Sequence, residues 1–330
     1  MKGLTKDIAV SMLLGLVLPG MLLNFAEAVW NRAMQMQMET AAGMEASAAS
    51  TVRLPVKVCD SAGRVTERDM DTYLTGVVLA EMPAYFEEAA LMAQSVVART
   101  YAWKAHTTGG KHENGSICTE PSCCQAWISE EAYLQQGGTP EDVEKIRSMV
   151  LNTSGQVLTY DGELIEATYF SCSGGSTEDA AAVWGQEVPY LQAVDSPGEE
   201  KASHYQDTEI FTAAELEQKL GITLTGHPES WIRSVTYTRG GGVDSISIGG
   251  TFFTGLEIRR ELGLYSTAFS AVPEGDCLAF TTKGYGHRVG MSQYGADAMA
   301  VAGHTYEEIL MYYYQGAELI QLDGKSVLGS

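Results

Sequence analysis

Hydrophobic and polar residues recur with two different periods along the chain. Asp69–Glu81 and Glu87–His106 carry apolar residues at three- and four-residue spacings, which predicts two consecutive helices. Gln156–Tyr160 and Glu163–Phe170 flank Asp161-Gly162, a residue pair typical of a tight hairpin turn. Strand-like and helix-like segments mix without a regular βαβ order, so the sequence predicts an α+β fold.

Further elements are predicted on both sides of this hairpin. The stretch 191–230 differs from its surroundings, with eight acidic residues against two basic ones, and we interpret 191–275 as a second lobe or a large insertion. The other predicted elements are strands at Val52–Cys59, Val235–Thr238, Val243–Ile248 and Leu278–Thr282, and helices at Thr139–Met149, Gly255–Leu262, Ala296–Ala302 and Tyr306–Tyr314.

An uncharged, largely apolar run, Ile8–Ala26, follows Lys2 and Lys6 near the N-terminus. At about 1.5 Å per residue the run is long enough to cross a bilayer as a helix. Ala26-Glu27-Ala28 is an alternative signal-peptidase site, but the run exceeds an ordinary signal core, so we favour an uncleaved single-pass anchor in the cell membrane. Because the positive charges come first, we expect a cytoplasmic N-terminus, an anchor at 1–30, a tether at 31–50 and an extracytoplasmic region at 51–330.

The charge balance narrows the class of ligand. The chain holds 21 basic and 42 acidic residues, a net charge of −21, and all but one unit of this charge belongs to the region after residue 50. Proteins that bind nucleic acid or anionic lipid surfaces neutralise phosphates with Lys and Arg. The composition therefore argues against both of these partners.

Glu81 is the first candidate for chemistry. It ends an apolar segment, where desolvation would raise the pKa of its carboxyl group to the range that a general acid needs. The alternative is an exposed glutamate at a helix end. Arg99, in the next helix, would orient a substrate or pair with Glu81; its alternative is a surface guanidinium.

A second candidate is a metal site in a loop rich in Gly, Asn, Ser and Pro. His112, Cys118, Cys123 and Cys124 have a spacing that suits one tetrahedral zinc ion, and four protein ligands would make its role structural. A disulfide within the loop, or His106 in place of one cysteine, is the alternative. The remaining cysteines are interpreted as small buried side chains; they are Cys59, Cys172 and Cys277.

Two glycine-rich segments complete the candidates. Ser171–Ser176 pairs glycines with hydroxyl groups, which would let backbone amides approach a sugar-like ligand. Gly284–Gly295 lacks the spacing of a dinucleotide-binding loop and is interpreted as a groove wall for a polar, uncharged polymer, with a plain tight loop as the alternative.

Together these segments resemble the stage II sporulation protein D family, peptidoglycan lytic transglycosylases of endospore-forming bacteria. The matching segments span nearly all of the chain after residue 50. They are Tyr73–Pro83 (YLTGVVLAEMP), Ala93–Tyr101 (AQSVVARTY), Ser171–Glu178 (SCSGGSTE), Pro189–Val194 and Gly284–Ala296.

The resemblance implies how the chemistry would be divided among residues. Glu81 would protonate the glycosidic oxygen between N-acetylmuramic acid and N-acetylglucosamine, and would then accept the proton of the muramyl C6 hydroxyl as a 1,6-anhydro ring closes. The residues expected to contact the substrate are Arg99, Tyr190, Ser173, Gly174, His287, Met291 and Gln293.

The resemblance also implies partners and a place in the cell. The substrate would be glycan strands stripped of peptide, cut during forespore engulfment at the engulfing membrane of the mother cell. The expected partners are a sporulation amidase or endopeptidase and an associated membrane protein. A non-catalytic cell-wall-binding module that recruits or enhances an amidase is the alternative function.

Three positions depart from the family's pattern. Arg288 replaces a glycine in the G-H-G-V-G-M-S-Q loop, where it would narrow the groove or contact a sugar carboxylate. Gln192 stands where a basic residue is common. Cys123 takes the place of a histidine among the metal ligands, and a thiolate is an acceptable replacement.

Overall fold

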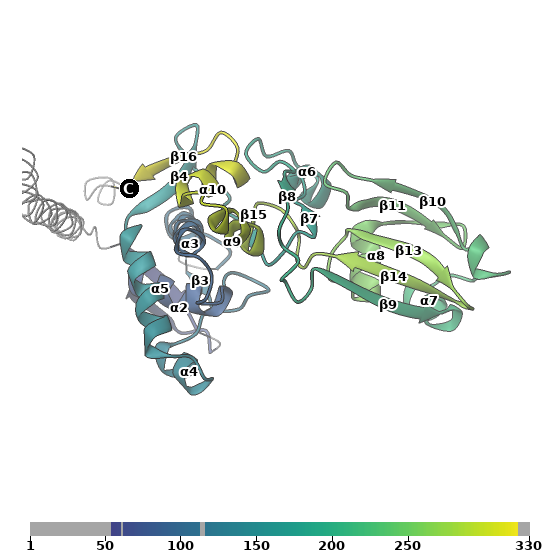
Figure 1. Ribbon diagram of the computed structural model, residues 1–330, viewed down its shortest axis with the longest axis horizontal. Coiled ribbons are helices and arrows are strands. Elements are labelled where there is room, and N and C mark those ends of the chain that lie inside the picture. Colours follow the sequence, from purple (N-terminus) through teal and green to yellow (C-terminus); the bar gives the residue numbers. More distant parts are fainter. Residues whose placement is uncertain (1–53, 61, 113–115, 323–330) are drawn as a thin grey trace, which may run out of the picture. The chain divides into compact units, whose positions relative to one another are not determined.

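The computed structural model describes residues 54–60, 62–112 and 116–322 (Figure 1). The predicted anchor and tether lie outside these residues. Among the residues that are described, no helix has the length and apolar character needed to span a bilayer. The described part mixes helices with small sheets, which confirms the predicted α+β class.

Helices and strands alternate irregularly along the chain. The helices are α2 (Met70–Glu81), α3 (Glu88–Thr108), α4 (Glu130–Gln135), α5 (Pro140–Asn152), α6 (Ala180–Trp184), α7 (Ala213–Leu220), α8 (Gly255–Leu262), α9 (Gln293–Val301) and α10 (Tyr306–Tyr313). The strands are β1 (Pro55–Cys59), β2 (Val65–Asp69), β3 (Ile117–Cys118), β4 (Gln156–Tyr160), β5 (Glu163–Leu164), β6 (Tyr169–Phe170), β7 (Gly175–Ser176), β8 (Asp195–Ser196), β9 (Gln206–Thr212), β10 (Ile232–Tyr237), β11 (Val243–Ile248), β12 (Thr251–Thr254), β13 (Phe269–Glu274), β14 (Cys277–Lys283), β15 (Met291–Ser292) and β16 (Glu318–Gln321).

The first hydrophobic core forms around α3. This helix is rich in alanine and other small residues, so α2, α5, α9, α10 and β4 can all approach it closely. The sheets β2-β1-β3 and β16-β4-β5 and the parallel pair β15-β6 complete the same core. Because α3 is surrounded on most sides, thirteen of its 21 residues are buried.

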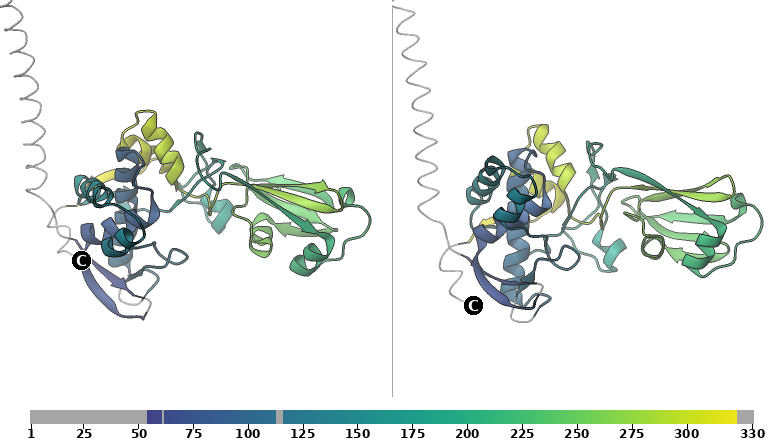
Figure 2. Two further views of the ribbon diagram at one scale, coloured as in Figure 1. Left: turned by 60° about the horizontal axis from the view of Figure 1, so that its bottom comes forward. Right: turned by 90° about the horizontal axis from the view of Figure 1, so that it is seen from below.

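A second hydrophobic core forms between residues 206 and 283. Strand orders β10-β11-β12 and β13-β14-β9 give two small antiparallel sheets, and Figure 2 shows α7 and α8 packed beside their strands. Phe211, Leu216, Ile246, Ile258 and Phe280 are among its buried residues. Both helices begin with a capping box and end at a left-handed glycine, which fixes their lengths.

The predicted hairpin turn is present, but the second strand is shorter than expected. Asp161 and Gly162 both have positive φ angles, as a two-residue turn between right-twisted strands requires. Pairing with β4 stops at Leu164, and the chain then turns away. Tyr169 and Phe170 pair instead with β15, which brings two segments distant in sequence side by side.

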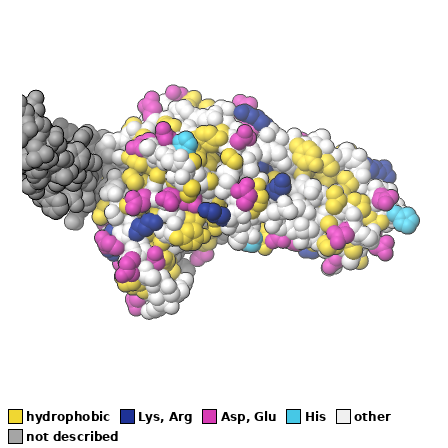
Figure 3. All heavy atoms as spheres, in the orientation of Figure 1, with side chains coloured by type: hydrophobic (Ala, Val, Ile, Leu, Met, Phe, Trp, Pro, Cys, Tyr) yellow, Lys and Arg dark blue, Asp and Glu magenta, His cyan; other side chains and the backbone are white. Residues whose placement is uncertain are grey.

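Acidic side chains are spread over the surface. On the face shown in Figure 3, Asp and Glu are scattered among apolar and uncharged side chains and do not gather into one patch. The acidic residues therefore form no single charged patch on this face.

Candidate functional site

Glu81 is the last residue of α2. Asp69 caps the start of this helix, and the extended Met82 followed by Pro83 ends it, as predicted. Residues 73–79 are buried, Ala80 is exposed, and Glu81 itself is half-buried. The helix therefore holds this carboxyl group at the border between the first core and the surface.

Three donors fix the carboxyl group of Glu81. Its Oε1 accepts hydrogen bonds from the backbone N–H of Ala126 at 2.8 Å and from the Tyr169 hydroxyl at 3.2 Å. Its Oε2 accepts one longer bond, 3.4 Å, from Nε2 of Gln293. Oε1 is thus fully engaged, whereas Oε2 keeps capacity for another partner.

Burial raises the pKa of Glu81 above its ordinary value, and the bonds from Ala126, Gln293 and Tyr169 oppose that rise without cancelling it. Desolvation disfavours the charged form of a carboxyl group. The same burial keeps the Tyr169 hydroxyl protonated, because it raises the pKa of that phenol, so Tyr169 acts as a donor. Glu81 therefore has the electrostatic setting of a general acid.

A close approach between two segments places the Ala126 donor. A Cβ atom on Gly76 would lie 2.3 Å from Nε1 of Trp127, so only glycine lets the chain around Trp127 lie against α2. The N–H of Ile128 donates to the Gly76 carbonyl at 3.1 Å. Gly76 in the Y-L-T-G-V-V-L-A-E-M-P motif thus positions the amide that binds Glu81.

Glu81 lies where two cavities meet. The larger one, about 840 Å³, runs past Tyr169 and His287, and the smaller one, about 330 Å³, runs past Met82 and Tyr133. Both are lined by Glu81, Ser171 and Gln293. An elongated ligand can therefore extend to both sides of a single carboxyl group.

Aromatic side chains and a neutral histidine form one wall of the larger cavity. The His287 ring lies 5.7 Å from the Phe170 ring and 6.0 Å from the Trp184 ring. Burial, aided by the positive charge of Arg259, lowers the pKa of His287 to about 4, so this ring is uncharged at neutral pH. His287 and Gln293, both predicted from the glycine-rich loop, line the cavity.

Arg99 does not reach either cavity, and the predicted substrate contact is wrong. Its side chain is fully buried and pairs with Asp71 at 3.0 Å, not with Glu81. It also donates to the carbonyls of Val150 and Gln156. Arg99 therefore ties α2, α3 and α5 together and is a structural residue.

Ser173 and Gly174 bind a carboxylate of the protein itself, so their prediction as sugar contacts is also wrong. Their backbone N–H groups donate to Oε2 of Glu199 at 2.6 and 3.0 Å, and the Ser173 hydroxyl adds a further bond. Ser196 donates to the other carboxylate oxygen at 2.5 Å. The segment does cradle a polar group, as its composition suggested, but Glu199 fills the cradle.

Tyr190 and Met291 lie outside the linings of the two cavities at Glu81. The Tyr190 hydroxyl accepts a bond from the Glu166 amide, and its ring packs on Tyr160 at 5.3 Å. Met291 is fully buried and pairs with Tyr169 in the parallel β15-β6 pair. Because Met291 is fully buried, its predicted substrate contact is wrong. Tyr190 is half-buried and does not line the two cavities described at Glu81, and its substrate contact stays a prediction.

Arg288 points away from the cavity, contrary to both sequence interpretations. It is 2% exposed and donates to the carbonyls of Ser173, Ser176 and Gly240. Its backbone has a φ of 65°, a conformation that glycine adopts without strain. The left-handed backbone explains why glycine suits this position in the family's pattern, and the side chain fastens the loop to the second core.

His112, Cys118, Cys123 and Cys124 come together, with all their ligand atoms within 4.8 Å of one another. Ideal tetrahedral zinc bonds imply distances of about 3.8 Å between two sulfurs and about 3.5 Å between sulfur and nitrogen. The structure has 3.9 Å between the sulfurs of Cys123 and Cys124 and 3.4 Å between Cys123 and Nε2 of His112. The donor set fits zinc.

The alternatives to this ligand set are not supported by the geometry. All six cysteines lie in the described residues and are free thiols. His106 stacks on Trp103 at 5.2 Å and does not belong to the cluster. Of the cysteines interpreted as buried, Cys172 is fully buried, whereas Cys59 and Cys277 are partly exposed.

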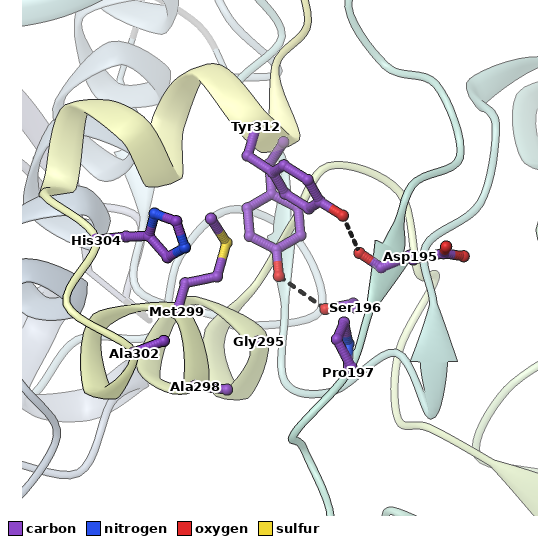
Figure 4. A pocket seen from close by; sticks show the side chains of 10 residues that line it. Asp195, Ser196, Pro197, Gly295, Ala298, Met299, Ala302, His304 and Tyr312 are labelled. Carbon is purple, nitrogen blue, oxygen red and sulfur yellow. Dashed lines mark hydrogen bonds between the residues drawn. The ribbon is translucent and has the colours of Figure 1, made fainter.

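A third cavity, about 250 Å³, lies between α9, α10 and the segment that follows β8 (Figure 4). Its walls include the small or apolar residues Gly295, Ala298 and Met299 of α9. The Tyr312 hydroxyl donates to the Asp195 carbonyl at 2.6 Å across one side. The one acidic residue of this lining is Asp195, which is exposed to solvent, so we place the candidate site at the half-buried Glu81.

The cavity at Glu81 also contains residues that the sequence did not single out. Tyr169 and Trp184 carried no motif signal, because exposure of an aromatic side chain depends on tertiary packing. Arg259 lies next to Arg260 on an amphipathic helix, a pattern that usually marks a solvated face. Lys111 belongs to the same group, whereas Tyr101 and Tyr285, which also line the cavity, lie in segments that the sequence analysis quoted.

Comparison with known proteins agrees with the sequence resemblance. Residues 60–160 match the family model SpoIID, described as stage II sporulation protein. The chain is 40% identical over 287 residues to stage II sporulation protein D of Bacillus subtilis, covering 85% of this chain and 82% of the relative. The corresponding protein of Bacillus amyloliquefaciens is 37% identical over 259 residues, covering 77% and 75%. An amidase enhancer of Bacillus subtilis is 30% identical over 304 residues, covering 74% of this chain and 40% of that protein.

Proposed function

Because the chain belongs to the SpoIID family of stage II sporulation proteins, we propose that it is a lytic transglycosylase acting on peptidoglycan during sporulation. It cleaves the β-1,4 bond between N-acetylmuramic acid and N-acetylglucosamine in glycan strands that carry no peptide. The observation that carries the proposal is the part-buried Glu81 at the meeting point of two cavities. A strand cut within its length must extend to both sides of the catalytic acid.

One carboxyl group carries both proton transfers. Burial raises the pKa of Glu81, which favours the protonated form that a general acid needs, and Oε2, the oxygen with fewer hydrogen bonds, would deliver the proton to the glycosidic oxygen. The bond from the muramyl C1 to that oxygen breaks, and the muramyl C6 hydroxyl attacks C1. Glu81 takes the C6 proton as the 1,6-anhydro ring closes, so no water is consumed and no second carboxylate is needed.

We further propose that His112, Cys118, Cys123 and Cys124 hold one structural zinc ion. When bound, zinc would cross-link a loop that has little hydrophobic core of its own. Gln125 and Ala126 follow this loop directly: the Ala126 amide binds Glu81, and Nε2 of Gln125 donates to the Tyr169 hydroxyl at 3.2 Å. The clamped loop thereby holds two groups that orient the catalytic carboxyl.

The location and the partners are part of the same proposal. The apolar run Ile8–Ala26 would anchor the chain in the cell membrane, with the catalytic region on the extracytoplasmic side of the mother cell's engulfing membrane. A sporulation amidase or endopeptidase, with its associated membrane protein, would work beside it. Such a partner would supply the peptide-free strands that this site accepts.

Digestion of purified peptide-free glycan strands tests the assignment. The full-length chain should yield products with 1,6-anhydromuramyl ends, detected by mass spectrometry, and Glu81→Gln should reduce their rate of formation about 10²–10⁴-fold. Glu88→Gln, an exposed glutamate at the start of α3, is the matched control and should keep full activity. Anhydro products that persist in Glu81→Gln would refute the role of Glu81, and reducing ends alone would mean ordinary hydrolysis.

The second candidate function is a cell-wall-binding module that enhances an amidase without cutting glycan. It is favoured by the relative named amidase enhancer, which is 30% identical over 74% of this chain. Equal inactivity of the wild type and Glu81→Gln, together with normal glycan binding and faster peptide removal by an added amidase, would favour this function over transglycosylation.

A further inference from the structure

Arg259 enters the larger cavity from the second core. It lies in the last turn of α8, and α8 is fixed by the buried Ile258 and Leu262. A Cβ on Gly255, the first residue of the helix, would lie 1.9 Å from the Val243 carbonyl, so the helix is in close contact with β11. The guanidinium group of Arg259 is therefore delivered to the cavity by a rigid element.

This guanidinium group has no anionic partner. It makes neither a hydrogen bond nor an ion pair with any residue in the part of the chain that the structure describes, although it is only partly exposed. Burial lowers the pKa of Arg259, and the one neighbour that opposes the shift is the Tyr285 phenol. A desolvated cation without a counter-charge is unfavourable, and an incoming anion would relieve that cost.

The other charged groups of the cavity do not supply this anion. Glu81 is held by its own three donors and has a raised pKa, and His287 is neutral. Lys111, the second cation of the lining, donates to the Cys123 carbonyl within the loop of the metal-ligand cluster. The positive charge of Arg259 is thus available to an anionic ligand, although the protein as a whole has a net charge of −21.

We propose that Arg259 binds the free lactyl carboxylate of a muramic acid residue and so makes the site selective for strands whose stem peptides have been removed. The inference rests on the proposed function, because it concerns the same groove. A guanidinium group offers two parallel N–H donors to a carboxylate. In a strand that still bears peptide, the lactyl carboxyl is an uncharged amide and cannot form this pair.

The neighbouring side chains suit a sugar at this position. Trp184 and Tyr285, which line the same cavity, are 44% and 43% exposed, so part of each ring is accessible to the apolar face of a pyranose. Apolar contact with these aromatic rings would hold the pyranose ring, and Arg259 would bind the lactyl carboxylate that the pyranose carries. The selectivity then lies in one charge and not in the shape of the groove.

Binding to an inactive chain separates this inference from the catalytic one. In full-length Glu81→Gln, calorimetry would compare a peptide-free glycan fragment with a chitin oligosaccharide of equal length, which has the same backbone but no lactyl group. Arg259→Gln should weaken binding of the peptide-free fragment about tenfold and leave chitin oligosaccharide binding within about twofold. The matched control is Arg260→Gln, because Arg260 is exposed and paired with Glu261 at 2.7 Å; it should change neither.

Each outcome decides the matter. Equal weakening of both ligands would assign Arg259 to support of the groove and overturn the proposal. Tighter or equal binding of peptide-bearing fragments by the Glu81→Gln chain would also overturn it. Since all measurements use an inactive variant, a wild type that fails to cleave glycan would refute the transglycosylase proposal and leave the binding result intact.

Discussion

Glu81 and Glu199 are two desolvated carboxyl groups with opposite surroundings. Glu199 is fully buried, and the amides of Ser173 and Gly174 and the hydroxyls of Ser173 and Ser196 bind both of its oxygens. Glu81 has three donors and opens onto two cavities. Both acids lie beside the segment that begins at Ser171. Glu199 is enclosed by the protein, whereas Glu81 is accessible to a ligand.

The comparison teaches that burial alone does not identify a catalytic acid. Glu199 is the more buried of the two, yet its contacts complete a folding unit that joins β7, β8 and the Tyr313 hydroxyl, which lies 2.7 Å from Ser196. Glu81 combines a raised pKa with an oxygen that still has capacity for a partner. The difference that matters between the two residues is therefore access to a ligand: Glu81 lines two cavities, and Glu199 lines neither of them.

Removal of the Glu199 carboxylate should have the largest effect on stability. Glu199→Ala leaves two backbone amides and two hydroxyl groups buried without their acceptor, so we expect a loss of about 3–5 kcal/mol in the free energy of unfolding. Urea unfolding followed by circular dichroism measures it. A loss below about 1 kcal/mol would contradict the view that Glu199 organises this segment.

Metal removal should act on Glu81 and leave Glu199 untouched. Chelation, or Cys123→Ser, should release one zinc ion per chain and lower the melting temperature. It should also reduce glycan cleavage by about tenfold or more, because the displaced Ala126 amide would no longer hold the Glu81 carboxyl group in position, and a misplacement of about 1 Å can cost about 10²-fold in rate.

Cys277→Ser is the matched control, since Cys277 lies outside the ligand cluster. It should retain the metal measured by plasma emission analysis. A metal-free wild type that cleaves glycan at the full rate would refute the orienting role of the loop.

The free energy of unfolding should depend on pH through the buried carboxyl group of Glu81. Burial raises the pKa of Glu81, so the folded chain binds its proton more tightly than the unfolded chain does. The stability linked to this proton is fully present below the unfolded glutamate pKa of about 4.3, and it is lost as the pH rises through the folded pKa.

The uncharged amide of Glu81→Gln avoids that loss. This variant should therefore be more stable than the wild type at pH 7, by about 1–2 kcal/mol, and the difference should vanish toward pH 4. Thermal unfolding across this pH range measures it. Glu88→Gln, with its exposed side chain, should show no such pH-dependent gain.

The smallest expected effect concerns Arg288, which donates to the carbonyl of Ser173 next to the Glu199 cradle. Arg288→Ala and Arg288→Gly lose the same side-chain bonds, but only glycine relieves the left-handed backbone. The glycine variant should therefore be more stable than the alanine variant by about 1 kcal/mol. Equal stabilities in chemical unfolding would mean that the backbone carries no strain there.

Local patterns predicted much of the fold. α2, α5 and α8 lie within a few residues of their expected bounds, because capping residues and Met82-Pro83 mark helix ends within the sequence itself. β9 and α7 in the acidic stretch were not predicted. Their pairing with β14 and packing on α8 come from residues distant in sequence.

The site was predicted less completely, for a related reason. Glu81, His287 and Gln293 were found because each lies in a motif that also shapes the backbone. Arg99 and Arg288 were misassigned, because the partner of a charged side chain is set by tertiary contacts. Arg99 pairs with the carboxylate of Asp71, and Arg288 donates to three backbone carbonyls. Arg259 carried no motif and is the arginine that reaches the cavity.

The exposed Trp184 ring gives the groove an optical property. Trp103 and Trp231 are buried at 6% and 5% exposure, whereas Trp184 is 44% exposed and lines the cavity at Glu81. Indole emission shifts to shorter wavelength when the ring leaves water. A saccharide that covers Trp184 should therefore shift the fluorescence of the unlabelled protein to shorter wavelength. This shift would allow binding in the groove to be followed in real time.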